Sequence, residues 1–283
     1  FSIIFRKVMK KNIDNKTVQS FGDEWSRYDQ SGMSDEESLK IFNEYFSIFP
    51  WNLISDRSEG FDMGCGSGRW ARWMAEKVGI LNCIDPSDAI EISKNNLKNF
   101  KNINYFRASV DDDIQLTASQ DFGYSLGVLH HIPDTQAALS SCVKLLKPGA
   151  PFLVYLYYSF DNRSKLYRFI WKVSDLIRRL IFILPSFLKH WLTDCIAILI
   201  YYPLTRIALA AERCGIDISN IPLSYYKDHS LYTMRTDARD RFGTPLEQRF
   251  SKEKIHNMML EAGLDEIKFS SNAPFWCAVG YKK

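Results

Sequence analysis

Three glycines at alternate positions follow an acidic residue in the segment DMGCGSG (62–68). They lie between a short apolar stretch and an amphipathic helical pattern, so bare main chain can approach a ligand near the amino end of the helix. A dinucleotide fingerprint would need glycine where Arg69 stands, and Asp62 would repel a pyrophosphate. The spacing favours a phosphate-free ligand with an ammonium group or hydroxyls, and an ordinary tight turn is the alternative.

A second acidic residue, Asp85, ends the apolar segment ILNCI (80–84). A carboxylate at the end of the second strand of such a unit can accept hydrogen bonds from both hydroxyls of a ribose. The alternative is an acid in the first turn of the next helix, although Ser87 is better placed to cap that helix. Asp62, the glycines and Asp85 together favour S-adenosylmethionine, which carries an amino group, ribose hydroxyls and a sulfonium.

Histidines are the candidates for proton transfer. His130 and His131 are adjacent in LGVLHHIPD (126–134), and we expect His130 to have a structural role. His131, or His229 further along the chain, is the candidate catalytic base, because an imidazole titrates near neutral pH. The alternative for His131 is a cap on the helix that begins at Thr135.

Aromatic residues near the N-terminus are candidates for contact with the cofactor. Trp25 and Tyr28 lie three residues apart in SFGDEWSRY (20–28), so they share one face of a helix. Aromatic rings attract a sulfonium by cation–π interaction, worth about 0.5–2 kcal/mol. A hydrophobic patch that packs on the edge of the sheet is the alternative.

The elements that position these residues alternate between strand and helix. Strands are predicted near 61–63, 80–84, 103–108, 122–128 and 151–158, and helical patterns of roughly 10–15 residues separate most of them. This alternation indicates right-handed βαβ units and a parallel sheet. After a helix at 251–262, two strands at 266–270 and 275–282 are so close in sequence that they should form an antiparallel hairpin.

Five motifs in one order resemble a class I S-adenosylmethionine-dependent methyltransferase of the small-molecule type, similar to methyltransferase type 11. The motifs are DMGCGSG (62–68), IDPS (84–87), RASVDD (107–112), GYSLGVLHHIPD (123–134) and LLKPGAPFLVYLYY (145–158). The resemblance implies an α/β, Rossmann-like fold with a seven-stranded, mostly parallel sheet, an antiparallel C-terminal hairpin and a helical insertion. It also implies S-adenosyl-L-methionine as the cofactor.

The resemblance assigns cofactor contacts to the positions that match these motifs. The three glycines border the methionine moiety, Asp62 fixes its amino group directly or through water, and Asp85 holds the ribose. The end of the fourth strand borders the sulfonium. Besides Trp25 and Tyr28, the expected cofactor-binding residues are Asp62, Gly64, Cys65, Gly66, Gly68, Asp85, Pro86, Ser109, Val110, Leu126 and Gly127.

The adenine contact departs from the family pattern. Such enzymes usually have a Gly-Asp pair after the third strand, and this chain has Ala108 and Ser109 there. The adenine amine must then find another acceptor, and the candidates are Ser109, the backbone of Val110 and Asp111.

About 90 residues interrupt the core, so the chain divides into four parts. An N-terminal helical cap (1–57) precedes the cofactor-binding core (58–158). A mostly helical insertion (159–250) follows, and a C-terminal helix and hairpin (251–283) complete the core. Loops and insertions over the carboxyl edge of a sheet shape substrate specificity, so the insertion is expected to be a lid over the acceptor pocket.

Two heavily apolar helices are predicted in the insertion, at 165–184 and 190–215. Charged residues interrupt both and Pro203 bends the second, so a membrane-spanning segment is not expected. Besides a lid, a homodimer contact and a peripheral membrane contact through 165–215 stay open.

The last part of the insertion is rich in polar and aromatic residues. These either line a substrate site or form a surface ion-pair network, and an arginine cluster would suit an acidic or phosphate-bearing acceptor. The residues are Tyr225, Tyr226, His229, Tyr232, Arg235, Asp237, Arg239, Asp240, Arg241 and Arg249. The expected partner is a small-molecule acceptor that is acidic, a glycan or lipid-linked.

The composition excludes several other classes. The chain has 283 residues, a net charge of +3 and 46% hydrophobic residues, which is globular and has no basic stripe, so a nucleic acid partner is not expected. The six cysteines form no CxxC pair and no metal-ligand spacing with the histidines, so neither a metal site nor a disulfide framework is predicted. The expected location is the cytoplasm, with membrane association left open by the insertion.

Two rival functions use the same residues. An NAD(P)-dependent oxidoreductase conflicts with Arg69 and Asp62, as noted above. A non-catalytic cofactor-binding partner protein, built around the apolar insertion, is the second. The resemblance favours an S-adenosylmethionine-dependent methyltransferase that acts on a small molecule, a lipid or a glycan-type acceptor by in-line methyl transfer.

Overall fold

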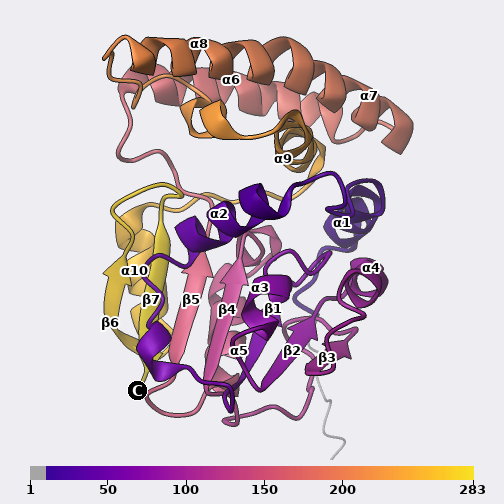
Figure 1. Ribbon diagram of the computed structural model, residues 1–283, viewed down its shortest axis with the longest axis vertical. Helices are drawn as coiled ribbons and strands as arrows, with labels where there is room; N and C mark the ends of the chain where they lie inside the picture. The colour runs from indigo at the N-terminus through magenta and orange to yellow at the C-terminus, as the bar shows by residue number, and fades with distance from the viewer. Residues whose placement is uncertain (1–10) are drawn as a thin grey trace, which may run out of the picture.

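The strands of the protein form one mixed sheet, shown in Figure 1. The computed structural model describes residues 11–283, so the start of the predicted N-terminal cap, residues 1–10, lies outside the described part. The strands are β1 (Glu59–Met63), β2 (Ile80–Ile84), β3 (Ile103–Phe106), β4 (Phe122–Leu126), β5 (Pro151–Tyr155), β6 (Leu264–Phe269) and β7 (Cys277–Lys282).

The order of strands in the sheet is β3-β2-β1-β4-β5-β7-β6. Strands β1 to β5 are parallel, whereas β7 is antiparallel to both β5 and β6. The predicted α/β fold, with a seven-stranded, mostly parallel sheet and an antiparallel C-terminal hairpin, is confirmed. From β1, strands β2 and β3 are added toward one edge of the sheet, whereas β4 and β5 are added toward the other edge, so the order of strands switches between β1 and β4. Open α/β sheets bind ligands at such a switch point, at the carboxyl ends of the strands.

Helices cover both faces of the sheet and one of its ends (Figure 1). The α-helices are α1 (Asn15–Arg27), α2 (Asp35–Tyr45), α3 (Ala71–Ala75), α4 (Ala89–Asn96), α5 (Thr135–Leu145), α6 (Lys165–Ile181), α7 (Ser186–Ile196), α8 (Tyr202–Arg213), α9 (Leu231–Gly243) and α10 (Lys252–Glu261). The short helical turns are η1 (Trp51–Leu53), η2 (Leu129–His131), η3 (Ala197–Tyr201) and η4 (Ser224–Asp228).

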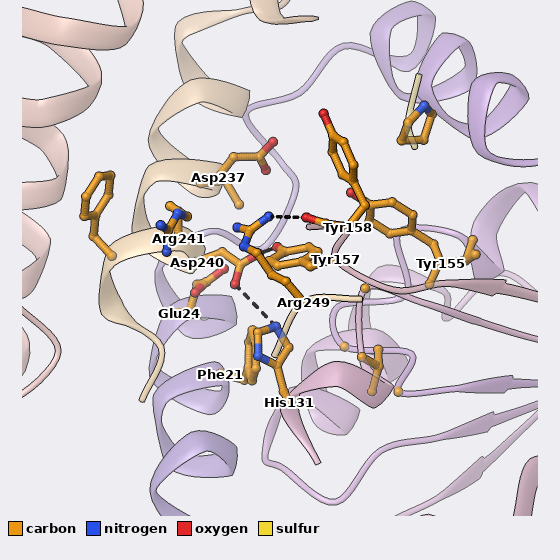
Figure 2. Close-up of a pocket in the computed structure, with 18 of the residues that line it drawn as sticks. Phe21, Glu24, His131, Tyr155, Tyr157, Tyr158, Asp237, Asp240, Arg241 and Arg249 are labelled. Atoms are coloured by element: carbon orange, nitrogen blue, oxygen red, sulfur yellow. Dashed lines mark hydrogen bonds and ion pairs between the residues drawn. The ribbon is translucent and has the colours of Figure 1, made fainter. Parts of the chain in front are cut away.

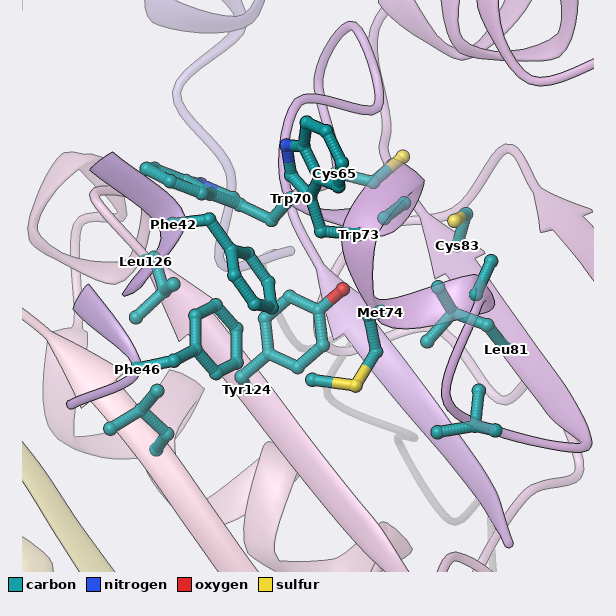
Figure 3. Packing of buried hydrophobic residues seen from close by; sticks show 14 of the residues in the cluster. Phe42, Phe46, Cys65, Trp70, Trp73, Met74, Leu81, Cys83, Tyr124 and Leu126 are labelled. Atoms are coloured by element: carbon teal, nitrogen blue, oxygen red, sulfur yellow. The ribbon is translucent and has the colours of Figure 1, made fainter. Parts of the chain in front are cut away.

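Two buried clusters hold the helices against the sheet. On one face, Phe42 of α2 and Phe46 just after it stack at 4.3 Å between ring centroids. They pack with Met74 of α3 and Tyr124 of β4 (Figure 3). On the other face, side chains of α5 and α10 such as Leu139 pack against the sheet. Fully burying each such side chain stabilises the fold by about 1.5–3 kcal/mol, so the sheet is a rigid base for its carboxyl-edge loops.

The insertion has a third buried cluster of its own above the carboxyl ends of the strands (Figure 1). The predicted helix at 190–215 is the continuous run α7–η3–α8, in which Pro203 follows the π-helical turn η3, where a missing N–H is easily accommodated. Helix α9 was not predicted from the sequence. It begins at the N-cap Ser230, whose hydroxyl accepts from the N–H of Thr233 at 3.2 Å.

Candidate functional site

A cavity of about 540 Å³ lies between the carboxyl edge of the sheet, helix α1 and the insertion. At one end it is lined by the loops after β1, β2, β3 and β4, and helix α1 lies alongside. At the other end it is lined by β5, the segment after it, and helices α6, α8 and α9. The predicted lid therefore lines the same cavity as the glycine loop, which is residues 64–68 after β1.

The glycine loop needs the conformational freedom that its sequence provides. Gly64 and Gly66 line the cavity with φ of +82° and +53°, a region that other residues rarely adopt. A Cβ on Gly66 would lie 3.0 Å from Nε1 of Trp25, so the main chain approaches the indole closely. Gly68 does not line the cavity, because it packs against Leu97 at the end of α4.

Asp85 lies in the cavity at the end of β2, where it also orders the glycine loop. One carboxylate oxygen accepts from the N–H of Gly66 at 2.9 Å, and the other accepts from both the N–H and the hydroxyl of Ser87. Burial raises the pKa of Asp85, and these donors partly oppose the shift. The hydroxyl of Ser87 accepts from the N–H of Ala89 at the start of α4, whose N-cap residue is Asp88 and not Ser87, so Asp85 and the first turn of the helix form one local network.

Asp62 is fully buried in β1, under the loop and not among the cavity residues. Neither of its carboxylate oxygens has a hydrogen-bond partner in residues 11–283, and burial raises its pKa well above the usual range. A direct contact of Asp62 with a bound molecule is therefore not favoured by this geometry. The alternative of contact through water is compatible with two orphaned oxygens beneath the loop.

Trp25 of α1 and Tyr28, the residue after α1, have different surroundings in the structure. Trp25 lines the cavity beside the glycine loop. Tyr28 lies away from it, because its hydroxyl donates to Asp194 at 2.8 Å and its ring packs on Tyr232. Phe21, which the sequence analysis did not single out, lines the cavity instead and packs edge-on to His131 at 4.9 Å.

The region predicted to hold adenine is partly occupied by the N-terminal segment. Ser109 and Val110 line the cavity, as do Cys65 and Pro86 from the preceding loops. Asp111 accepts from the backbone N–H of Asn12 at 2.7 Å and is not a cavity residue. The neighbouring residues Ser109 and Val110 are therefore the better placed of the candidates.

His131 enters the cavity from η2, directly after β4. Its Nδ1 lies 2.6 Å from the carbonyl oxygen of Leu246, which can only accept, so Nδ1 carries the proton. Its Nε2 then has a free lone pair, and it lies 3.8 Å from Oδ1 of Asp240 without a hydrogen-bond partner in residues 11–283 (Figure 2). Leu126 and Gly127, just before η2, line the same part of the cavity.

His130 and His229, the other two histidines that the sequence analysis considered, have different surroundings from His131. His130 is fully buried outside the cavity and stacks on Tyr157 at 3.8 Å, and burial holds its pKa well below the usual range. His229 lines the cavity and packs on Tyr225 at 4.7 Å. Burial lowers the pKa of His229 to about 4, so its ring is neutral at neutral pH.

Of the polar and aromatic residues predicted near the end of the insertion, some line the cavity and others bond to neighbouring helices. The residues that line the cavity are Tyr225, Tyr226, His229, Asp237, Asp240, Arg241 and Arg249. Tyr232, Arg235 and Arg239 do not. Arg235 pairs with Asp194, and the fully buried Arg239 pairs with Asp23.

Two of the arginines that line the cavity share one buried acid. Arg241 and Arg249 both bond to Glu247, at 3.0 and 2.8 Å, and the side chain of Glu247 is only 2% exposed. Arg249 also donates to the carbonyl oxygen of Tyr158 (Figure 2). Because two guanidinium groups share the carboxylate of Glu247, this cluster keeps a positive charge, which is compatible with an acidic acceptor.

Polar cavity residues that the sequence analysis missed come from α1 and from the segment just after β5. Glu24 is buried, and burial, followed by the charge of Asp240, raises its pKa well above the usual range. Tyr157 donates its hydroxyl hydrogen bond to Asp240. Tyr157 belongs to the run PFLVYLYY, where an aromatic residue at the carboxyl end of a central strand was a usable signal.

Known proteins resemble this chain in sequence and fold. A family model described as a methyltransferase domain matches residues 61–154. A ubiquinone biosynthesis O-methyltransferase of Saccharophagus degradans is 27% identical over 161 residues, which cover 50% of this chain and 66% of that protein. The matched part thus spans slightly less than two thirds of this curated relative.

Solved structures share the fold across most of the chain. A methyltransferase of Haloferax volcanii, solved in complex with a methyltransferase activator, is 14% identical with a TM-score of 0.54 and covers 94% of this chain and 96% of its own. An S-adenosylmethionine-dependent methyltransferase of Aquifex aeolicus is 12% identical with a TM-score of 0.51, over 92% and 96% of the two chains.

The cavity residues fit the cofactor of this family. Gly66 leaves the space that a Cβ would fill beside Trp25, and Asp85 presents a buried carboxylate for ribose hydroxyls. The apolar and aromatic surroundings suit a sulfonium better than a pyrophosphate. Residues 61–154 therefore form a methyltransferase domain of the class I type, whose cofactor is S-adenosylmethionine.

Proposed function

We propose that the protein transfers a methyl group from S-adenosylmethionine to a hydroxyl group of a small acceptor that carries an apolar portion. The observation that carries the proposal is the continuity of the cavity. It joins the glycine loop and Asp85 to His131, and then runs on to an aromatic and aliphatic region between β5 and the insertion. The relative of Saccharophagus degradans, an O-methyltransferase of ubiquinone biosynthesis, supports an oxygen acceptor.

The cofactor-binding residues would be the glycine loop, Asp85, Ser109, Val110 and Trp25. S-Adenosylmethionine supplies an electrophilic methyl group next to an excellent leaving group. The protein then has to align an acceptor oxygen, exclude water and take up one proton.

His131 is suited to take up that proton. The carbonyl of Leu246 fixes its tautomer, so the lone pair of Nε2 is available to the hydroxyl of an acceptor. When Nε2 is protonated, the carboxylate of Asp240 at 3.8 Å stabilises the imidazolium. Tyr157 holds Asp240 in place, and burial keeps the pKa of Tyr157 well above the usual range, so it stays a donor.

His229 is the weaker candidate base. Burial lowers its pKa to about 4, and neither of its ring nitrogens has a hydrogen-bond partner in residues 11–283 that would fix a tautomer. Such a ring stays neutral and suits an apolar contact with an acceptor, for which its stacking on Tyr225 is also favourable.

Two measurements test the proposal. Calorimetry with S-adenosylhomocysteine tests the cofactor site, and release of S-adenosylhomocysteine tests transfer to a series of 4-alkylphenols, with the matching alkylamines as controls. We expect transfer to the phenols, with kcat/KM rising by up to about fourfold for each methylene that enters the apolar region. Binding of S-adenosylhomocysteine without transfer to any phenol would indicate a non-catalytic binding protein, and transfer to the amines alone would exclude an oxygen acceptor.

A further inference from the structure

Helices α6 and α7–η3–α8 form the outermost layer of the insertion (Figure 1). Both expose large apolar side chains. On α6 the exposed apolar residues recur every three or four positions. Together they define the apolar face: Leu166, Phe169, Ile170, Val173, Leu176, Ile177, Leu180, Ile183, Phe187, Trp191, Ile198, Leu199, Ile200 and Ile207. Several are more than 60% exposed, such as Leu180 at 68% and Leu199 at 72%. Contiguous apolar surface of this kind marks an interaction site.

Exposed cations follow one edge of the apolar stripe on α6. Lys165, Arg168, Lys172 and Arg179 are all exposed and lie three, four and seven residues apart, so they share one side of the helix. Asp175, the one acidic residue of α6, pairs with Arg178 and Arg179, so Lys165, Arg168 and Lys172 are the cations of this border that it does not engage. An amphipathic helix with an apolar face and a cationic border is typical of a segment that lies in the interface of an anionic membrane.

The run Ser186–Arg213 is long and apolar enough to cross a membrane by length and composition, although no such span was expected from the sequence. Its contacts favour a position in the plane of a bilayer. On its inward side, His190 and Thr193 are buried, and Asp194 accepts from Tyr28 and pairs with Arg235. A spanning orientation would expose these polar groups to lipid, at a cost of several kcal/mol.

The cavity reaches the apolar face. Ile170 and Ile177 of α6 and Ile200 of η3 line the cavity, and they are also 42%, 46% and 49% exposed. These residues therefore border both the cavity and the apolar face. A second copy of the chain bound to this face would cover them, whereas a bilayer would leave them in contact with lipid.

We propose that the apolar face docks this protein on the surface of an anionic lipid bilayer, with α6 and α7–η3–α8 lying in the interface. The border of cations meets the lipid headgroups and the aliphatic side chains enter the acyl region. The cavity beside Ile170 and Ile200 then admits an apolar acceptor directly from the lipid. This last step rests on the proposed methyl transfer, whereas the docking does not.

Flotation with vesicles tests the docking directly. The full chain is mixed with vesicles of phosphatidylcholine and phosphatidylglycerol, or of phosphatidylcholine alone, and the bound fraction is measured. We expect strong binding to the anionic vesicles that weakens with salt. Leu176→Glu or Leu199→Glu should lower the partition constant by roughly tenfold or more. Leu53→Glu and Leu260→Glu, at exposed positions outside the apolar face, should leave it unchanged.

The cationic border has its own test. Lys172→Gln should weaken binding to the anionic vesicles by about fivefold, corresponding to about 1 kcal/mol per cation at the surface. Lys98→Gln, an exposed lysine near the end of α4, should have no effect. Calorimetry with S-adenosylhomocysteine shows whether each variant keeps a folded cofactor site, so loss of docking is distinguished from loss of methyl transfer.

Three results would overturn the docking proposal. The first is that wild-type protein which still binds S-adenosylhomocysteine does not bind either kind of vesicle. Retention in the membrane pellet after alkaline carbonate treatment is the second, because it indicates a spanning helix. The third is a dimer that Leu176→Glu converts to a monomer while vesicle binding is absent, which would assign the apolar face to a second copy.

Discussion

Nε2 of His131 lies 3.8 Å from Oδ1 of Asp240, and the two residues come from different parts of the chain. His131 is in η2, directly after the core strand β4, whereas Asp240 is in α9 of the insertion. The carbonyl of Leu246, which fixes the tautomer of His131, also belongs to the insertion. The candidate base is therefore complete only when the insertion is packed on the core.

We predict that His131→Gln lowers kcat by about 10²- to 10⁴-fold, because the acceptor hydroxyl loses its base. The affinity for S-adenosylhomocysteine, measured by calorimetry, should change little. His256→Gln, on α10 and outside the cavity, is the matched control. Unchanged turnover in His131→Gln would remove His131 from the mechanism.

Asp240 is a positioning residue, and Asp240→Asn should act through His131. We expect a smaller loss of kcat than in His131→Gln, with the affinity for S-adenosylhomocysteine unchanged, because an imidazolium at position 131 loses a neighbouring carboxylate. Combining the two substitutions should cause little further loss, so additive losses in the double variant would indicate a purely structural role.

Gly66→Ala should weaken the binding of S-adenosylhomocysteine by about tenfold or more, because alanine is disfavoured at φ of +53° and its Cβ meets Trp25. Gly149→Ala is the control, because its φ is +78° and no atom lies within 4 Å of the added Cβ. It should lower the melting temperature without changing the affinity. Equal affinity losses in both variants would show that backbone strain, and not close approach, is responsible.

Asp85→Asn should raise the dissociation constant of S-adenosylhomocysteine by about 10- to 100-fold, the equivalent of one hydrogen bond to a charged group. The amide also accepts less well from Gly66 and Ser87, so the loop loses part of its order. Asp88→Asn serves as the comparison, because Asp88 pairs with Arg107 at the surface and should not affect binding. An affinity unchanged in Asp85→Asn would contradict the assigned ribose contact.

His229 should make stability depend on pH. Its pKa is lowered to about 4 by burial, so between pH 4 and 6.5 the unfolded chain binds a proton that the folded chain does not. Stability is therefore complete above pH 6.5 and falls as the pH drops toward 4, by about 2 kcal/mol between pH 7 and pH 5. Urea unfolding of wild type and His229→Asn at both pH values measures this, and the same decline in both would refute it.

Glu247→Gln should destabilise the protein by about 3–5 kcal/mol, because Arg241 and Arg249 lose the buried carboxylate between them. Burial raises the pKa of Glu247, but the two guanidinium groups more than offset this and its pKa is lowered. Glu91→Gln, which breaks a surface pair with Lys94, should change the free energy of unfolding by less than about 0.5 kcal/mol. Similar small effects in both variants would show that water reaches Glu247.

The core of the fold was predictable because its local signals agree. Glycines, a strand-ending acid and apolar runs such as PFLVY each indicate the same parallel sheet, and the structure has the strands there. The third strand, which is only partly buried, was also found, although it ends at Phe106 and not at Ala108. Such shifts are expected, because the ends of a strand are set by pairing with neighbours.

Helix α9 could not be found in the same way. Its buried side carries the charged residues Asp237, Asp240 and Arg241 beside the apolar Met234, Ala238 and Phe242, so its apolar stripe is narrow and interrupted. The clearer local signals were Ser230 at its start and Gly243 at its end. Tyr28, which was expected to contact the cofactor, lies outside the cavity for a related reason. Its partner Asp194 is distant in sequence and belongs to the insertion.

Asp194 has a consequence for how the parts of the molecule move. Its carboxylate bonds to Arg27 and Tyr28 of the N-terminal cap and to Arg235 of α9, so one side chain ties three helices together. Swinging the insertion outward would break all of these charge-assisted bonds at once. We therefore expect the N-terminal cap and the insertion to move as a single block.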